Sequence, residues 1–330
     1  MTSREVILAN LAGDGSAPRC GLTFSGQRTN DVLCLGPRRP AGYEPRRWVE
    51  GKLEYYDDEW GNLWSRMVGG CQKGEIHRPV LTDWSQLDDL RLPDYTQPET
   101  WADMAAAFAG ETERYRMAAI GGWIFDNARY LRRLEVYLLD MGLYPDELGR
   151  LHEMVASVYE TKIRAAAAAG ADGILIGEDL GTQTGPLFSP GMFRSYFKPL
   201  YTRLLGVAHE AGMAVWLHSC GQNWLLIDDL CDCGVDVFQF DQPLVYDLEA
   251  LAAKLKARRA ALWSPVDIQQ VLPTGDRELI ERESRRMVEA FRGHLIAKNY
   301  PDLPGIGVAA EWDQWAYEAM VAASGAAAVL

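Results

Sequence analysis

A histidine and a cysteine two positions apart follow an apolar run of the sequence. The run covers residues 213–217 and leads directly into His218 and Cys220. In a strand, positions i and i+2 project to the same face, so the imidazole and the thiol are expected side by side at the strand's end. Zinc binds neutral imidazole nitrogen and thiolate sulfur, and a catalytic zinc keeps one position open for water or substrate. The pair predicts part of a zinc site that needs a third ligand.

Two adjacent acidic residues are candidates for that third ligand. Glu178 and Asp179 directly follow the apolar segment 173–177. Neighbouring side chains on an extended chain point in opposite directions, so only one of the two carboxylates is expected to face the site. That carboxylate is a metal ligand, a general base, or the cap of a following turn. We therefore take Glu178 and Asp179 as candidate catalytic residues, and Glu178 also as a candidate metal ligand.

The other cysteines do not suggest a second metal site. The six cysteines are few and irregularly spaced, which argues against a disulfide framework; they are Cys20, Cys34, Cys71, Cys220, Cys231 and Cys233. Cys231 and Cys233 invite a four-ligand structural zinc. However, residues 224–230 have a helical pattern that leads away from the strand end, so these two thiols are expected in the core.

The elements that position these residues alternate along the chain. From about residue 99 onward, short apolar segments alternate with amphipathic helical patterns. The predicted strands are 117–121, 173–177, 213–218, 235–240, 261–266 and 294–297. The predicted helices are 127–140, 145–169, 190–210, 224–230, 248–258, 276–291 and 311–322. Before them, residues 20–24 are expected to form a first barrel strand, followed by an elaborated loop and a hairpin with strand-like runs at 53–56 and 62–67.

Repeated βα units with strands of about five residues predict a parallel sheet that is buried on both faces. With seven or eight units, a closed (β/α)8 TIM barrel is the natural solution, and residues 1–330 are expected to form one domain. A doubly wound open sheet is the alternative, but no Gly-x-Gly-x-x-Gly turn follows an early strand. In such barrels the active site gathers at the carboxyl ends of the strands. Residues near those ends are the candidate substrate-binding residues: Arg28, Trp123, Phe125, Gln183, Gln239, Trp263 and Asp267.

The composition argues against two classes of partner, nucleic acids and membranes. The net charge of −13 argues against nucleic acid as a partner, because phosphate binding needs a positive field. No apolar stretch is long enough to cross a bilayer, and the N-terminus does not lead into a secretory signal. The sequence thus predicts a soluble cytoplasmic protein that acts on a small molecule and has no membrane or nucleic-acid partner.

Several short motifs occur in a fixed order along the chain. They extend from about residue 45 to the end of the chain and comprise Asp58-Glu59-Trp60-Gly61, residues 177–183, Ser189-Pro190, Phe197-Lys198-Pro199, His218-Ser219-Cys220-Gly221 and Asp267-Ile268-Gln269-Gln270. These motifs resemble those of the uroporphyrinogen decarboxylase superfamily, and the resemblance implies a (β/α)8 barrel with its pocket at the strand mouths. It also implies one of two chemistries.

One branch of the superfamily decarboxylates uroporphyrinogen without a metal, using an aspartate and an arginine-rich N-terminal loop. The matching region here, residues 21–28, has a single arginine, Arg28, where that loop has two. The other branch resembles cobamide-dependent methyltransferases, whose zinc is held by a His-x-Cys pair and a distant third cysteine. His218 and Cys220 match the pair, but no cysteine follows Cys233, so Glu178 or Asp179 must substitute.

The preferred hypothesis is zinc-assisted methyl transfer from a corrinoid, carried on a possible corrinoid protein, or from a methylated small molecule, to a thiol-type acceptor. The first alternative is a metal-free decarboxylase of uroporphyrinogen or a smaller aromatic acid, with Asp179 and Arg28 in the pocket. The second is a non-catalytic barrel that binds a corrinoid or serves as a partner subunit.

Overall fold

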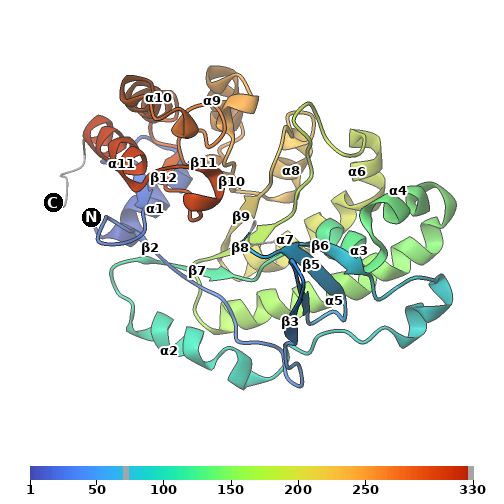
Figure 1. Cartoon of the computed structure of the whole chain (residues 1–330). Helices are drawn as coiled ribbons and strands as arrows, with labels where there is room; N and C mark the ends of the chain where they lie inside the picture. The colour runs from blue at the N-terminus through green and yellow to red at the C-terminus, as the bar shows by residue number, and fades with distance from the viewer. Residues whose placement is uncertain (70–73, 326–330) are drawn as a thin grey trace.

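A barrel of eight parallel strands forms the centre of the molecule (Figure 1). The computed structural model describes residues 1–69 and 74–325, so Cys71 lies outside the described residues. Around the barrel the strand order is β1-β12-β11-β10-β9-β8-β7-β2, and every paired neighbour is parallel. The strands are β1 (Gly21–Thr23), β2 (Val32–Leu35), β7 (Tyr115–Ala119), β8 (Gly173–Gly177), β9 (Ala214–His218), β10 (Val237–Gln239), β11 (Ala261–Ser264) and β12 (Leu295–Lys298). The predicted TIM barrel is confirmed.

The barrel sheet has a seam between β1 and β2, its two edge strands. The chain leaves β1, turns, and runs back antiparallel to it, with Asp31 N donating to Leu22 O at 2.7 Å and an isolated bridge between Thr23 and Asn30. It then reverses again into β2, which pairs with β7. Strand β2 was not predicted from the sequence, because it has only four residues, contains a cysteine, Cys34, and ends at a Gly-Pro pair.

A second, antiparallel sheet of four strands makes up the predicted hairpin region, which is larger than expected. Its strands are β3 (Arg47–Glu50), β4 (Leu53–Asp57), β5 (Leu63–Met67) and β6 (Glu75–Arg78). The Asp58 carboxylate organises the β4–β5 turn by accepting hydrogen bonds from Trp60 N, Asn62 N and Trp64 Nε1. Trp64 then contacts Tyr130 edge-on, with ring centroids 4.8 Å apart, which fixes this hairpin sheet beside the first helix after β7.

Eleven α-helices occur in the described residues: α1 (Ser3–Ala12), α2 (Ala102–Gly110), α3 (Ile124–Arg132), α4 (Leu134–Leu143), α5 (Pro145–Ala168), α6 (Pro190–Tyr196), α7 (Lys198–Glu210), α8 (Ile227–Cys233), α9 (Leu248–Ala257), α10 (Arg277–Ala290) and α11 (Ala310–Ser324). Two predicted helices are broken. The 127–140 segment divides at Arg133, which has a φ of 68°, and the 190–210 segment divides at Phe197, two residues before Pro199. Within the described residues, none of the helices is both long and apolar enough to span a bilayer.

Helix α1 was not predicted, and it covers the amino-terminal end of the barrel. Its Ile7 is fully buried in the apolar cluster that fills the barrel, together with Val32, Met117 and Ile296. A Cβ on Gly21 would lie 2.6 Å from Ile7 Cδ1, so any larger residue here would force the Ile7 side chain to shift. The closed end leaves the carboxyl ends of the strands as the open mouth of the barrel.

Candidate metal centre

Three potential metal ligands converge where β8 and β9 end. Gly177 pairs with His218 in the parallel ladder, so the residues that follow β8 lie next to the end of β9. The ligand atoms of Asp179, His218 and Cys220 all lie within 4.8 Å of one another. His218 Nε2 is 3.6 Å from an Asp179 oxygen and 3.6 Å from Cys220 Sγ. The expected pairing of His218 with Cys220 is present, and the carboxylate that joins them belongs to Asp179.

A series of hydrogen-bonded polar side chains orients the His218 ring. Its Nδ1 is hydrogen-bonded to the amide oxygen of Gln239, at the end of β10. The Gln239 amide nitrogen donates to Asp241 at 2.6 Å, and Lys298 Nζ lies 3.0 Å from the same carboxylate oxygen. Because a carbonyl oxygen only accepts, Nδ1 must carry the proton, and the lone pair of the neutral ring is then on Nε2. This nitrogen is the one that faces Asp179 and Cys220.

The electrostatics of the three groups are coupled. Burial lowers the pKa of His218, but hydrogen bonds with Asp179 and Cys220 outweigh this effect and raise the pKa well above its usual value. Burial raises the pKa of the Cys220 thiol, and the neighbouring His218 only partly offsets that rise. The side chains of His218 and Asp179 are 30% and 38% exposed, so ions and small molecules can reach them. Without a metal, the raised pKa values favour a protonated His218 and a neutral Cys220 thiol, and a divalent cation that binds here must displace these protons.

The donor set matches the preferences of zinc. A carboxylate oxygen, an imidazole nitrogen and a thiolate sulfur are all zinc ligands, and three protein ligands leave a fourth tetrahedral position open. The partner of Nδ1 is also typical, since a metal-bound histidine usually donates its other N–H to a carbonyl or carboxylate oxygen. Asp179, His218 and Cys220 thus fit a catalytic zinc site in their donor atoms, spacing and supporting hydrogen bonds.

Glu178 lies in a different environment from its neighbour. It is 1% exposed, and its Oε2 accepts hydrogen bonds from the backbone N–H groups of Phe125 and Asp126 at 2.8 and 3.3 Å. Burial, together with the nearby Asp126 charge, raises its pKa well above the usual value. The structure therefore places Glu178 at the start of α3, where it caps the helix, and not among the three converging ligands.

The predicted substrate-binding residues are scattered. Trp123 and Phe125 are 0% exposed and pack against other aromatic rings, so neither reaches the mouth. The reason is that β7 ends at Ala119, and these residues already belong to the start of α3. Gln183 is exposed on the loop before α6. Gln239 contacts His218, as described above.

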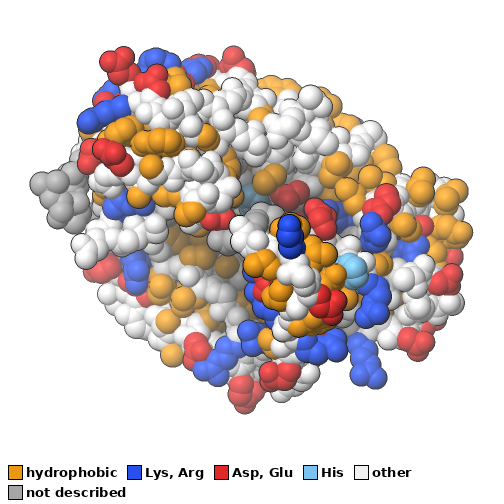
Figure 2. Space-filling view, viewed as in Figure 1, with side chains coloured by type: hydrophobic (Ala, Val, Ile, Leu, Met, Phe, Trp, Pro, Cys, Tyr) orange, Lys and Arg blue, Asp and Glu red, His pale blue; other side chains and the backbone are white. Residues whose placement is uncertain are grey.

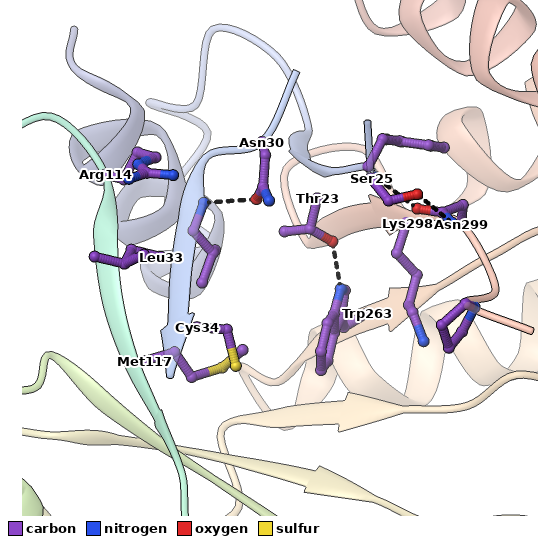
Figure 3. Close-up of a pocket in the computed structure, with 13 residues that line it drawn as sticks. Thr23, Ser25, Asn30, Leu33, Cys34, Arg114, Met117, Trp263, Lys298 and Asn299 are labelled. Atoms are coloured by element: carbon purple, nitrogen blue, oxygen red, sulfur yellow. Dashed lines mark hydrogen bonds between the residues drawn. The ribbon is translucent and has the colours of Figure 1, made fainter. Parts of the chain in front are cut away.

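The remaining three predicted residues also differ in their surroundings. Arg28 donates to Asp313 on α11 at 2.7 Å and lies against the rings of Phe24 and Tyr317. Asp267 is 1% exposed and accepts hydrogen bonds from three backbone N–H groups, those of Leu244, Gln269 and Gln270, which is a loop-stabilising role. Trp263 lines a cavity between the strands (Figure 3).

A second polar group near the mouth was not recognised in the sequence. On α3, Arg129 Nε donates to Asp126 at 2.7 Å, and Tyr130 OH donates to the other Asp126 oxygen at 3.2 Å. Burial lowers the pKa of Arg129, but the charges of Asp126, Tyr130 and Asp179 raise it above its usual value. The spacing of Asp126, Arg129 and Tyr130 at i, i+3 and i+4 is the only sequence signal, and exposed ion pairs on helices share it. Figure 2 shows this face of the molecule, with a hollow beside the hairpin sheet and acidic side chains at its edge.

Comparisons with known proteins bear on the fold and on the family of this chain. A solved methyltransferase from Methanosarcina mazei matches 77% of this chain and 72% of its own, with a TM-score of 0.60 and 18% identity, which shows a shared fold. A glycosylated endo-beta-1,4-xylanase from Gloeophyllum trabeum matches 72% of this chain and 84% of its own, with a TM-score of 0.44 and 13% identity. A search of curated proteins gave no match. The family profile described as uroporphyrinogen decarboxylase (URO-D) matches residues 68–325, and the chain therefore belongs to that family.

Proposed function

We propose that this chain is a zinc-dependent methyltransferase whose metal is held by Asp179, His218 and Cys220. The observation that carries the proposal is the convergence of these three ligand atoms within 4.8 Å at the open end of the barrel. The fold shared with the Methanosarcina mazei methyltransferase is compatible with it. Bound zinc would lower the pKa of a thiol acceptor, so that the thiolate can accept a methyl group at neutral pH.

The chain's own residues prepare the site for that role. Gln239 holds the His218 ring with Nε2 toward Asp179 and Cys220, and Asp241 holds Gln239 in turn. Cys220 N donates to Asp179 Oδ1 at 3.2 Å, which keeps the carboxylate close to the thiol. Thiolate and carboxylate together supply two negative charges. They balance the charge of one divalent cation, and the neutral imidazole adds none.

The methyl donor is proposed to be a corrinoid, carried on a partner protein, or a methylated small molecule. The competing metal-free decarboxylase would use Asp179 and Arg28. Arg28 is engaged by Asp313, and its side chain is only 17% exposed, so its placement offers no support for a carboxylate-binding role at the mouth. The non-catalytic alternative predicts ligand binding without turnover.

Metal analysis of the purified protein tests the proposal. We expect about one zinc per chain in the wild type and none in the His218→Ala/Cys220→Ala double variant. Cys231→Ala removes a half-buried thiol from α8 and is the matched control, which should keep its zinc. Methyl transfer from methylcobalamin to a small thiol should follow the zinc content. Absence of zinc from the wild type, or full retention in the double variant, would overturn the proposal. Release of carbon dioxide from uroporphyrinogen that is lost in Asp179→Asn would favour the decarboxylase instead.

A further inference from the structure

A cavity of about 380 Å³ lies at the seam between β1 and β2. Figure 3 shows the residues that line it. Leu33, Cys34 and Met117, from β2 and β7, line one side, while Trp263 and Lys298, from β11 and β12, line the other. The volume is near the lower end of the range for small-molecule sites. We call this space the seam cavity.

An aromatic ring in a fixed position forms part of its wall. Trp263 Nε1 donates to Thr23 Oγ1 at 2.7 Å, and the Trp216 ring lies edge-on to it with centroids 5.3 Å apart. These contacts leave the ring little rotational freedom. The neighbouring polar rim is also ordered, because Asn299 accepts from Ser25 N at 2.9 Å and donates to Ser25 Oγ at 3.0 Å. A ligand that enters would therefore meet a surface that is already organised.

The seam cavity has two cationic side chains in its lining, and each of them is paired with an acidic residue. Among the described residues around the seam cavity, the charged side chains are Lys298 and Arg114. Arg114 is paired with Glu111 at 2.6 Å. Lys298 is 10% exposed and lies 3.0 Å from Asp241, with its ammonium 4.9 Å from the centre of the Trp263 ring. An ammonium group has three N–H donors, so the bond to Asp241 leaves donor capacity for a ligand.

We propose that the seam cavity binds a small aromatic carboxylate, with the ring against Trp263 and the carboxylate on Lys298. The pocket is linked to the metal centre, because Lys298 contacts Asp241, which holds Gln239, the partner of His218. As the substrate pocket of the enzyme, the cavity rests on the proposed function. As a binding site for aromatic acids it does not depend on zinc.

Calorimetric titration with benzoate tests the site, with benzyl alcohol as the uncharged counterpart of similar shape. We expect benzoate to bind the wild type at least about tenfold more tightly than benzyl alcohol. Lys298→Met should weaken benzoate binding by at least about tenfold, and Lys298→Arg should restore part of the loss, because it keeps the cation. Cys34→Trp fills the cavity from an exposed strand position and should also weaken binding, whereas Cys34→Ser leaves the volume open and should bind benzoate more tightly than Cys34→Trp does.

The Cys34 pair keeps the test decisive if Lys298→Met fails to fold. Absence of benzoate binding to the wild type, equal binding to Cys34→Trp and Cys34→Ser, or equal affinity for benzyl alcohol would overturn the inference. Zinc content is measured on the same preparations. Benzoate binding without zinc would reject the metal proposal alone, and zinc without benzoate binding would reject the seam cavity alone.

Discussion

Histidine side chains occupy opposite electrostatic settings in two regions of the molecule. One is the barrel mouth around His218, and the other is the helix layer, by which we mean α4 and α5 around His152. His152, on α5, is 1% exposed, and its Nε2 is hydrogen-bonded to the Tyr137 hydroxyl at 2.7 Å. Burial lowers its pKa to about 3, so this ring is neutral at physiological pH. At the mouth, Asp179 and Cys220 overcome the effect of burial and raise the pKa of His218. The difference teaches that an acidic neighbour, and a supported Nδ1, distinguish the candidate ligand His218 from the structural His152.

The largest effect is expected at the mouth itself. His218→Ala removes a ligand and should weaken zinc binding by more than about 100-fold, since loss of a supporting neighbour alone costs about 10–100-fold. Stability without metal should change little, because the side chain is partly exposed. Competition with a chromogenic zinc chelator measures the affinity. If His218→Ala binds zinc as tightly as the wild type does, His218 is not a metal ligand and its contrast with His152 has no bearing on metal binding.

The helix layer should show the converse behaviour. His152→Ala leaves the Tyr137 hydroxyl without its partner and opens a cavity, so we expect a loss of about 2–4 kcal/mol in the free energy of unfolding. Zinc affinity should be unchanged. Urea denaturation measures the stability, with His209→Ala, a partly exposed histidine paired with Asp236, as a control that costs under about 1 kcal/mol. Zinc loss in His152→Ala would show that the two regions are not independent.

Loss of the hydrogen bond between Gln239 and His218 Nδ1 should have an intermediate effect on zinc affinity. Gln239→Leu removes the acceptor that fixes the His218 ring and should lower zinc affinity by about 10–100-fold. Gln239→Glu keeps an acceptor and should retain most of the affinity. Gln183→Leu, at an exposed loop position, should behave like the wild type. If Gln239→Leu binds zinc as the wild type does, the polar chain behind His218 has no role in metal binding.

The smallest effect is a slope in the pH dependence of stability. The pKa of His152 is about 3 in the folded state and near 6.5 when unfolded, so the unfolded state binds the extra proton between these values. Stability is therefore lost as pH falls from about 6.5 toward 3, by up to about 1.4 kcal/mol per pH unit from this group. Denaturation of His152→Gln at pH values of about 4 to 6, between the folded and unfolded pKa values of His152, should give a flatter dependence of the unfolding free energy on pH. An unchanged slope would contradict the neutral assignment of His152.

Local pattern predicted most of the barrel, while backbone breaks and the missed strand depended on tertiary context. Apolar runs and helix periodicity identified seven barrel strands. Strand β2 escaped detection because it is short, and its place in the barrel depends on pairing with β7, which is distant in sequence. The break at Arg133, which has a φ of 68°, has no glycine or proline to announce it.

In the candidate site too, some features could be predicted from the local sequence and others depended on tertiary contacts. The i, i+2 spacing of His218 and Cys220 predicted their proximity, although β9 ends at His218 and Cys220 lies two residues past it. The choice between Glu178 and Asp179 depended on which carboxylate meets the start of α3, and the sequence does not contain that information. Trp123 and Phe125 were expected near the mouth because the end of β7 was placed two residues too late.

A crystal structure of the protein with zinc, with the metal located by anomalous scattering, tests the central claim most directly. The account predicts one peak at the mouth, about 2.3 Å from Cys220 Sγ, about 2.0–2.1 Å from His218 Nε2 and about 2.0–2.2 Å from an Asp179 oxygen. A fourth, non-protein ligand should complete the tetrahedron. A peak elsewhere in the molecule, or one at the mouth that excludes Cys220 or Asp179, would contradict the account.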